Sequence, residues 1–329
     1  MSLRVAFAGT PRFAVAPLLA LVQAGFTVVR VVTQPDRPAG RGMALRPPPV
    51  KEQAVALGLD VWQPERPGPD QWAEQLRRSG ADVLVVAAFA QRIPVQALAF
   101  LPLGCLNVHP SLLPRWRGAA PVAWALWAGD RVSGVTIMQM DEGWDTGPIL
   151  LQRSELIRPE DTAQSLEERL SRLGARLLVE TLHRLRARTL RPVAQDPAGA
   201  TLAPRLRKEH GRVDWQQDAR AIDRQVRALY PWPGAYGQVR DRTVKLLQVA
   251  PEPAGPGQAQ GLWPGRSEAA APGSIVRVDG ARRSLVVACG SGLVHLLQVQ
   301  PEGGRVMSGL DLANGLRLRP GDRFEVGGP

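Results

Sequence analysis

The chain of 329 residues is longer than one hydrophobic core usually supports, so its length predicts two domains. Its hydrophobic content of 44%, without any apolar run long enough to cross a bilayer, excludes a membrane-spanning protein and predicts a soluble globular one. Its two distant cysteines and four scattered histidines exclude a disulfide framework and a zinc site, so no metal is predicted.

The first half of the chain alternates between apolar strand patterns and helix patterns. Strands are predicted at residues 3–8, 27–33, 82–88, 103–108 and 132–140, and helices at residues 13–23, 70–79 and 163–188. Uninterrupted apolar strands suit a parallel sheet that helices cover on both faces. The order therefore predicts a doubly wound, mostly parallel, Rossmann-like α/β domain over residues 1–188, with ligands at the carboxyl ends of its strands.

The second half has a different pattern. Residues 189–204 are rich in Pro, Ala, Gly and Thr and are predicted to form an interdomain linker. A helix at 219–229 is followed by predicted short strands at 243–249, 274–278, 284–288 and 293–299. Several short strands separated by turn residues predict a small β-barrel over residues 205–329, and residues 251–272, dense in Pro, Gly and Ala, are predicted to be a flexible loop within it.

The formal charge of +11 is concentrated toward the second half. Residues 205–329 hold 18 Lys and Arg against 12 Asp and Glu, whereas the longer preceding part holds 23 against 18. Concentrated positive charge suits a polyanion such as RNA, through the release of condensed counterions. The alternative, a merely arginine-rich composition, stays open, because lysine occurs only at Lys51, Lys208 and Lys245.

Three polar side chains follow predicted strands in a pattern that suits catalysis. Asn107 and His109 lie two residues apart where strand 103–108 ends, so they project from the same side. Asp145 follows strand 132–140 in a tight turn, where a carboxylate can orient the imidazole as a general acid or base. An amide such as that of Asn107 can donate to a developing oxyanion, so the pattern predicts acyl transfer between two nitrogens. Asp141 is the alternative to Asp145.

Longer motifs around these residues resemble a known family. Asn-Val-His-Pro-Ser-Leu-Leu-Pro at 107–114, Arg-Gly-Ala-Ala-Pro at 117–121 and Asp-Thr-Gly at 145–147 are similar to the signature of the 10-formyltetrahydrofolate-dependent formyltransferases. Phe-Ala-Gly-Thr-Pro at 7–11 and Pro-Trp-Pro at 231–233 make the chain most similar to the members that act on methionyl-tRNA. The resemblance covers nearly the whole chain, and its least matched part begins at residue 251.

The resemblance implies roles for individual residues. Asn107, His109 and Asp145 become the expected catalytic residues. Tetrahydrofolate is expected against the turn formed by Ser111, Leu112, Leu113 and Pro114, with the pterin contacting the backbone of Ala88, Phe89 and Ala90. The family usually has Ala-Tyr-Gly where this chain has Ala-Phe-Ala, so the pocket at 88–90 departs from the common pattern.

Residues 34–50 form a long basic segment without apolar periodicity, which predicts a loop of unusual length for an α/β unit. It contains Arg37, Arg41 and Arg46, and the resemblance implies that these side chains contact tRNA. Arg41 lies between two glycines, which let a backbone approach closely, and is the candidate for insertion into the RNA groove. The resemblance also implies an oligonucleotide-binding-like barrel in the second half.

The predicted function is therefore transfer of a formyl group from 10-formyltetrahydrofolate to the amino group of initiator methionyl-tRNA, for translation initiation. The expected partners are this tRNA and folate, and the expected state is a monomer. The chain start lacks the pattern of a secretory signal, which predicts a cytoplasmic enzyme. Two alternatives remain: a folate-dependent formyltransferase acting on a small amine, and a noncatalytic tRNA-binding protein. A nicotinamide site is disfavoured, since residues 9–11 lack the Gly-x-Gly-x-x-Gly spacing.

Overall fold

The computed structural model describes residues 2–39, 43–94, 100–252 and 270–325. The chain divides into two compact units. The first contains residues 1–122, 131–157 and 165–204, and the second contains residues 123–130, 158–164 and 205–329. None of the helices in the described ranges has the length and apolar character that a membrane span needs.

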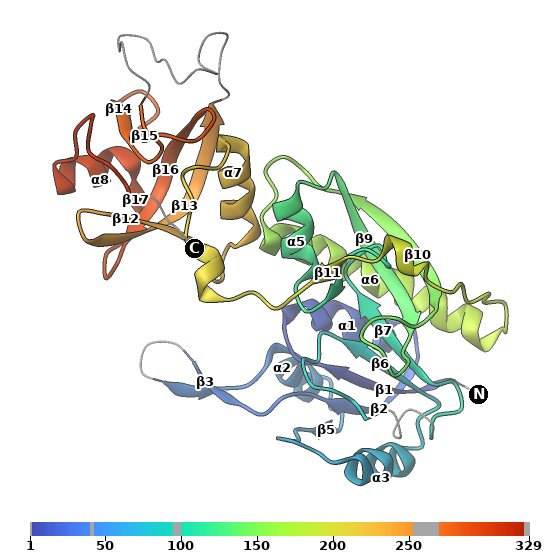
Figure 1. The fold of residues 1–329 in the computed structure, drawn as a ribbon. Helices are drawn as coiled ribbons and strands as arrows, with labels where there is room; N and C mark the ends of the chain where they lie inside the picture. Colours follow the sequence, from blue (N-terminus) through green and yellow to red (C-terminus); the bar gives the residue numbers. More distant parts are fainter. Residues whose placement is uncertain (1, 40–42, 95–99, 253–269, 326–329) are drawn as a thin grey trace. The chain divides into compact units, whose positions relative to one another are not determined.

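A seven-stranded mixed sheet forms the centre of the first unit (Figure 1). In spatial order its strands are β10 (Ile149–Leu156), β9 (Val132–Gln139), β7 (Cys105–His109), β6 (Val83–Ala87), β1 (Arg4–Gly9), β2 (Thr27–Val32) and β5 (Val61–Trp62). The strands from β7 to β5 run parallel, while β9 is antiparallel to both of its neighbours. The predicted mostly parallel α/β domain is confirmed.

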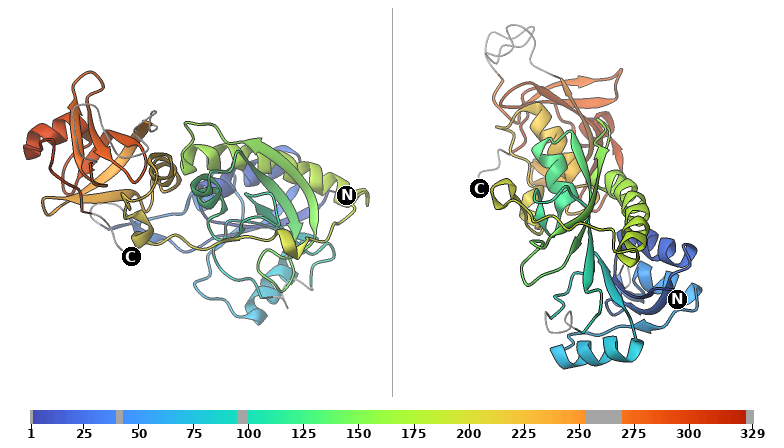
Figure 2. Two further views of the ribbon diagram at one scale, coloured as in Figure 1. Left: turned by 45° about the horizontal axis from the view of Figure 1, so that its top comes forward. Right: turned by 90° about the vertical axis from the view of Figure 1, so that its right-hand side faces the viewer.

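Helices cover both faces of this sheet, as Figure 2 shows. The helical elements of the first part of the chain are η1 (Arg12–Ala14), α1 (Val15–Gln23), α2 (Pro49–Ala56), α3 (Pro69–Ser79), α5 (Pro121–Ala128) and α6 (Ala163–Arg186). On one face, Trp72 and Leu76 of α3 pack in one cluster with Ala6 and Ala8 of β1. On the other face, a Cβ at Gly174 of α6 would come within 2.9 Å of a methyl group of Val108, so the α6 backbone lies directly on β7. Both faces are thereby buried, which is why the strands read as continuous apolar runs.

The strand order reverses between β1 and β6, since β2 follows on one side of β1 and β6 pairs on the other. In doubly wound sheets ligands bind at the carboxyl ends of the strands beside such a reversal. Gly9 ends β1 there, and a Cβ on it would lie 2.6 Å from Ala14 Cβ and 2.9 Å from the Ala87 carbonyl oxygen. Only glycine therefore lets the chain turn this tightly between β1, η1 and the end of β6.

The prediction of an irregular loop over residues 34–50 is wrong in part. The segment contains a hairpin of β3 (Arg37–Ala39) and β4 (Ala44–Arg46), and α2 begins at Pro49. Strands this short, interrupted by proline, leave no alternating apolar pattern in the sequence. Arg41 lies outside the described residues.

A six-stranded antiparallel sheet forms the second unit. Its strands are β12 (Ala235–Val239), β13 (Arg242–Glu252), β16 (Leu293–Pro301), β15 (Ser284–Ala288) and β14 (Ile275–Asp279) in spatial order, with β17 (Met307–Ser308) paired to β16. Phe324 bridges to Val239 of β12 and Arg323 bridges to Ser274 beside β14, so residues 323 and 324 join the two edges of the sheet. The predicted β-barrel is confirmed. Most of the loop predicted at residues 251–272 lies outside the described residues.

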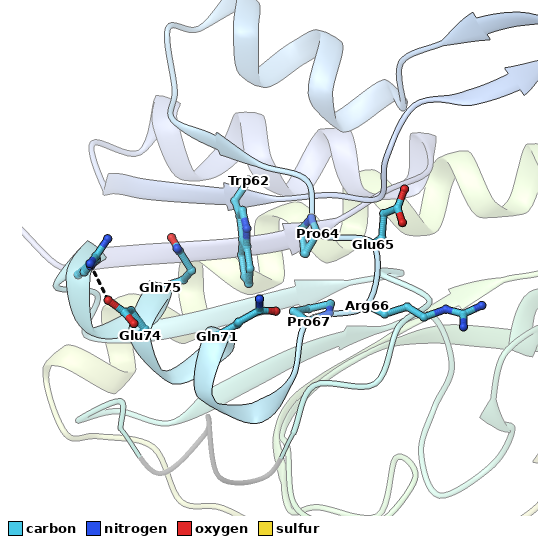
Figure 3. Close-up of a pocket in the computed structure, with 9 residues that line it drawn as sticks. Trp62, Pro64, Glu65, Arg66, Pro67, Gln71, Glu74 and Gln75 are labelled. Atoms are coloured by element: carbon cyan, nitrogen blue, oxygen red, sulfur yellow. Dashed lines mark ion pairs between the residues drawn. The ribbon is translucent and has the colours of Figure 1, made fainter.

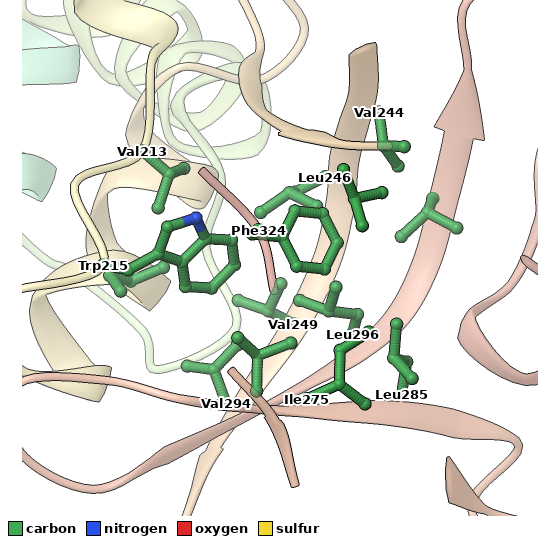
Figure 4. Close-up of a cluster of buried hydrophobic side chains, with 14 of the residues drawn as sticks. Val213, Trp215, Val244, Leu246, Val249, Ile275, Leu285, Val294, Leu296 and Phe324 are labelled. Atoms are coloured by element: carbon green, nitrogen blue, oxygen red, sulfur yellow. The ribbon is translucent and has the colours of Figure 1, made fainter. Parts of the chain in front are cut away.

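The barrel encloses its own apolar core, drawn in Figure 4. The rings of Trp215 and Phe324 lie 5.1 Å apart at its centre, surrounded by valines and leucines from the strands. The further helical elements of this part are η3 (Lys208–Gly211), α7 (Ala219–Ala228) and α8 (Gly309–Leu316). On α7, Ala219, Ile222 and Val226 follow the three-to-four spacing of a buried helix face and join the same core. Each unit is thus stabilised by separate hydrophobic burial.

Candidate active site

The structure brings Asn107, His109 and Asp145 together at the end of β7. The Asn107 side-chain amide donates to Asp145 Oδ1 at 3.1 Å. His109 Nδ1 lies 3.6 Å from Asp145 Oδ2, and the two side chains are 4% and 14% exposed. Asn107 and His109 share one side of the strand because they are two residues apart, and both therefore face the same carboxylate.

The other ring nitrogen of His109 makes a hydrogen bond. Its Nε2 donates to the backbone carbonyl oxygen of Trp116 at 2.9 Å, which assigns a hydrogen to Nε2 in this ring orientation. Nδ1 faces the Asp145 carboxylate on the other side. The ring is therefore held by one hydrogen bond and lies beside a carboxylate.

Both oxygens of the Asp145 carboxylate are held. Oδ1 accepts from Asn107, and Oδ2 accepts from the backbone N–H of Gly118 at 2.9 Å. The Asp145 backbone has φ of 55°, in the left-handed region that non-glycine residues seldom adopt. Strained backbone of this kind gathers at functional sites, where the surrounding structure maintains it.

Asp141, the alternative carboxylate, makes different contacts. Its Oδ1 accepts from the backbone N–H of Gly143 at 3.1 Å and from the Thr146 hydroxyl at 2.7 Å. Both partners belong to the turn that Asp141 itself begins. The geometry therefore favours Asp145 as the partner of His109 and gives Asp141 a role in shaping the turn.

The turn from Ser111 to Pro114 is held by side chains of β9 and β10, in the same sheet as β7. The Thr136 hydroxyl donates to the Ser111 carbonyl oxygen at 2.7 Å and accepts from the Leu113 N–H at 3.1 Å. The Gln152 amide donates to the Leu113 carbonyl oxygen at 2.9 Å. The side chains of Ser111 and Leu113 are buried, so they support the turn from inside, and a ligand would meet mainly its backbone and the half-buried Leu112 and Pro114.

Ala88, Phe89 and Ala90 follow β6 at the strand-order reversal. Phe89 is buried, and its carbonyl oxygen accepts from the Thr10 hydroxyl and the Gln34 amide at 3.3 and 3.1 Å. Ala88 and Ala90 are exposed and have φ of 48° and 59°. The backbone here has the left-handed geometry that glycine adopts most easily, which fits the glycine that the family usually has in place of Ala90.

The basic hairpin presents two arginines together. Arg37 and Arg46 are direct cross-strand partners, so their exposed side chains share one face of the hairpin. Two like charges placed opposite each other are unfavourable without an anion between them. The base of the hairpin is fixed by Asp36, whose carboxylate accepts from Lys51 at 2.8 and 2.7 Å. Hydrogen bonds from Gln63 and Lys51 hold the pKa of Asp36 below its usual value.

Several supporting groups have no clear signal in the sequence. Residues 193–204, within the predicted linker, belong to the first unit and pair with the site loop through β8 (Arg117–Gly118) and β11 (Leu202–Ala203). The Thr201 hydroxyl accepts from the Trp116 N–H at 2.9 Å. The short helix η2 (Pro197–Gly199) lies between Gln195 and Thr201 in the sequence. Gln195 is buried beside Asp145. A segment rich in Pro, Ala and Gly predicts a linker. Only the tertiary contacts show that this segment belongs to the first unit.

A cavity of about 530 Å³ lies elsewhere in the first unit, between α3 and the segment after β5 (Figure 3). Trp62, Arg66 and Gln71 line it, and Glu74 on its wall pairs with Arg78 at 2.7 Å. Asn107, His109 and Asp145 do not line this cavity. The cavity and the three polar side chains are therefore separate features.

The two parts of the chain match two family models. Residues 3–182 match the model described as formyl transferase, and residues 205–317 match the model described as formyl transferase, C-terminal domain. Residues 183–204 lie between the two matches.

Curated relatives are similar over the full length. The chain is 49% identical to a methionyl-tRNA formyltransferase of Anaeromyxobacter dehalogenans (strain 2CP-C), over 99% of this chain and 100% of the relative. It is 45% identical to a methionyl-tRNA formyltransferase of Solibacter usitatus (strain Ellin6076), over 99% of each chain.

Solved structures share the fold at lower identity. An N-formyltransferase of Helicobacter canadensis, in complex with folinic acid and dTDP-3-aminofucose, superposes with a TM-score of 0.64 at 16% identity, covering 89% of this chain and 98% of that one. HypX of Aquifex aeolicus, in complex with tetrahydrofolic acid, superposes with a TM-score of 0.60 at 18% identity, covering 95% of this chain and 47% of that one. At these identities the likeness supports the fold alone.

Proposed function

The chain belongs to the formyl transferase family, and on that premise we propose that it transfers a formyl group from 10-formyltetrahydrofolate to the α-amino group of initiator methionyl-tRNA. The observation that carries the proposal is the likeness to methionyl-tRNA formyltransferases along both units, at 45 to 49% identity. The proposal is also supported by the site, because Asn107, His109 and Asp145 lie together and carry the groups that acyl transfer needs.

The reaction needs few groups from the protein. The neutral amine of the methionyl ester attacks the formyl carbon, a new C–N bond forms, and the carbonyl oxygen becomes an oxyanion. Asn107 stabilises that oxyanion with the amide hydrogen that Asp145 does not bind. Substrate binding is proposed to free His109 Nε2 from the Trp116 carbonyl oxygen while Asp145 stays beside Nδ1. The bond from the formyl carbon to N10 then breaks, and the proton lost by the amine reaches N10 through Nε2 of His109. The products are N-formylmethionyl-tRNA and tetrahydrofolate.

Folate and tRNA are assigned to separate groups of residues. We propose that the folate binds against residues 111–114 with its pterin near residues 88–90, where the held turn and the exposed backbone offer preformed polar contacts. We assign catalysis to residues 1–188, the covalent connection between the units to residues 189–204, of which 193–204 also support the site loop, and RNA binding to the basic barrel of residues 205–329. Arg37, Arg41 and Arg46 would contact the acceptor stem. The enzyme is proposed to act as a cytoplasmic monomer.

The decisive experiment is transfer of a labelled formyl group from 10-formyltetrahydrofolate to charged initiator tRNA. Charged elongator tRNA and a small methionine ester serve as competing acceptors. Transfer to initiator tRNA at much higher kcat/KM than to either competitor is the expected result. Equal transfer to the small ester would support the small-amine alternative, and absence of any transfer with retained tRNA binding would support a noncatalytic protein.

The basic hairpin can be tested separately from catalysis. Replacing Arg37 and Arg46 together by leucine should lower kcat/KM for charged tRNA. The affinity for folate should be unchanged, because both side chains are exposed on the hairpin and do not belong to residues 88–90 or 111–114. Arg41→Leu should act in the same direction, since a bidentate contact to a base is worth roughly 1 to 3 kcal/mol. Arg78→Leu is the matched control, because Arg78 is 71% exposed in the same unit but outside the hairpin. Equal losses in the hairpin and control variants would remove the hairpin from tRNA recognition.

A further inference from the structure

We propose that Gln195 is a positioning residue that holds Asp145 in its working geometry, and that this makes residues 193–204 part of the catalytic machinery. The inference rests on the proposed function, because it concerns the same reaction. Gln195 lies in the stretch between the two family-model matches, so neither model includes it.

Gln195 uses both ends of its side-chain amide in one network. Its Nε2 donates to the carbonyl oxygen of Asp145 at 2.9 Å and to that of Gly147 at 2.7 Å. Its Oε1 accepts from Nε and from the terminal nitrogen Nη2 of Arg117, at 3.0 and 2.8 Å. The residue is 9% exposed, so these bonds form largely away from water, where an unmade hydrogen bond is costly.

The two carbonyls that Gln195 binds lie near the end of the turn that presents the carboxylate. Asp145 has a left-handed backbone with φ of 55°, which other residues must maintain. A single donor group bound to the carbonyls of residues 145 and 147 fixes the local course of the chain. The side chain of Asp145 is then aimed at Asn107 and His109.

Arg117 makes the network directional. Its guanidinium donates twice to Gln195 Oε1, so the amide must turn its NH₂ group toward the two carbonyls. The next residue, Gly118, donates its backbone N–H to Asp145 Oδ2. The segment of residues 117 and 118 therefore holds Asp145 from its carboxylate side, while Gln195 holds it from its backbone side.

The segment that carries Gln195 is itself anchored on the site loop. The Arg117 N–H donates to the Thr201 carbonyl oxygen at 2.8 Å, and Val193 bridges to Ile149 of β10. Gln195 lies between these two anchors, which limits its movement. A flexible linker would not provide such anchors.

The test is Gln195→Met in the full-length enzyme, which keeps the side-chain length and removes the amide's hydrogen bonds. We expect kcat with charged initiator tRNA to fall by about 10- to 100-fold, because a displacement of about 1 Å in a reacting group can cost about 100-fold. KM for tRNA and the affinity for folate should change by less than about twofold. The pH dependence of kcat should shift in the same direction as that expected of Asp145→Asn. If Gln195→Met does not fold, Gln195→Asn, which is too short to reach both carbonyls, carries the same test.

A double-mutant cycle separates positioning from general destabilisation. In an Asp145→Asn background, Gln195→Met should slow the reaction by less than about twofold, because the carboxylate that it positions is already absent. Equal slowing in both backgrounds would overturn the proposal.

Gln225 offers a matched control in the other unit. It is 7% exposed, and its Nε2 also donates to two carbonyl oxygens, those of His210 and Arg212, at 2.8 and 3.0 Å. Gln225→Met should lower the melting temperature and leave the pH dependence of kcat as in wild type. If Gln225→Met shifts the pH profile as Gln195→Met does, or if Gln195→Met keeps wild-type kcat and pH profile, the positioning role is wrong. A wild-type enzyme without transfer activity would instead contradict the proposed function.

Discussion

The two units each contain a buried histidine beside a carboxylate, and the two pairs differ in an instructive way. In the first unit, His109 lies 3.6 Å from Asp145 and is 4% exposed. In the barrel, His295 lies 2.8 Å from Glu252 and is 1% exposed. The barrel pair is therefore the closer one and has the more buried histidine, although its carboxylate is 35% exposed against 14% for Asp145.

The remaining contacts distinguish the pairs. His295 Nδ1 is bonded to the fully buried Ser284 at 2.9 Å, and the carboxylate of Glu252 also accepts from Arg277 at 2.8 Å. The order serine, histidine, carboxylate resembles a hydrolytic triad, but this serine begins β15 and is fully buried, out of reach of a substrate.

The pair in the first unit has a different position in its fold. His109 ends the parallel strand β7, and Asp145 lies in the turn between β9 and β10, next to an amide that is only half-buried. A short contact thus identifies a stable pair, whereas position in the fold identifies a candidate for chemistry. The following predictions test this distinction.

The largest effect is expected from the first pair. His109→Ala should reduce kcat by about 10² to 10⁴, the usual contribution of a general acid or base. Asn107→Ala should reduce it by about 10² to 10³, as for an oxyanion donor. Single-turnover transfer to charged initiator tRNA measures both, with circular dichroism to establish that the fold is retained. Near-normal turnover in either variant would remove that residue from the mechanism.

Asp145→Asn should also be slow, with an altered pH dependence of kcat, because the amide cannot stabilise a protonated His109 as a carboxylate does. Asp141→Asn is the matched comparison, since Asp141 bonds only within its own turn in the contacts described above. If Asp145→Asn kept the wild-type pH profile while Asp141→Asn changed it, the assignment of the two carboxylates would have to be exchanged.

In the barrel, His295→Ala should affect stability and not chemistry. It leaves the fully buried Ser284 hydroxyl without this partner, which costs about 1 to 3 kcal/mol, while the partly exposed Glu252 keeps its bond to Arg277. A lower melting temperature with an unchanged transfer rate below the transition is the expected result. A slow but fully folded variant would show that the distinction between the two pairs is wrong.

The smallest effect concerns Glu252 and pH. Burial raises the pKa of this carboxyl, but hydrogen bonds from His295 and Arg277 outweigh burial, so its pKa lies below the usual value. A pKa lowered by folding stabilises the protein above the unfolded-state pKa of about 4.3, and this contribution disappears as the pH falls through the folded-state pKa. Urea unfolding of Glu252→Gln and wild type should therefore differ most near about pH 7 and converge below about pH 4. A constant difference across this range would contradict the assigned shift.

Much of the fold can be predicted from the sequence, because its sheet strands are buried. Apolar runs at β1, β2, β6 and β9 mark strands whose ends fall within one or two residues of the prediction. The segments that were missed lack such a signal. Helix α5 is apolar on every side, and strand β10 is half-exposed with a mixed pattern.

The candidate site, like the fold, can be predicted from the sequence only in part. Asn107 and His109 can be paired from their spacing alone, since strand geometry dictates that residues two apart share a side. Gln195 cannot be found this way, because its partners are 50 and 48 residues distant in sequence at Asp145 and Gly147. The sequence around it has the composition of a linker. Only the folded chain reveals that this segment supports the carboxylate.

The closure of the barrel by residues 323 and 324 has a consequence for biosynthesis. Because a ribosome makes the chain from its amino end, β12 and β14 emerge before the residues that join them. Until then β14 has a free edge and the edge of β12 is paired only around Tyr236, so both can pair with strands of other chains. A nascent or truncated chain that ends before residue 322 is therefore expected to associate with other copies, even when its first unit has already folded.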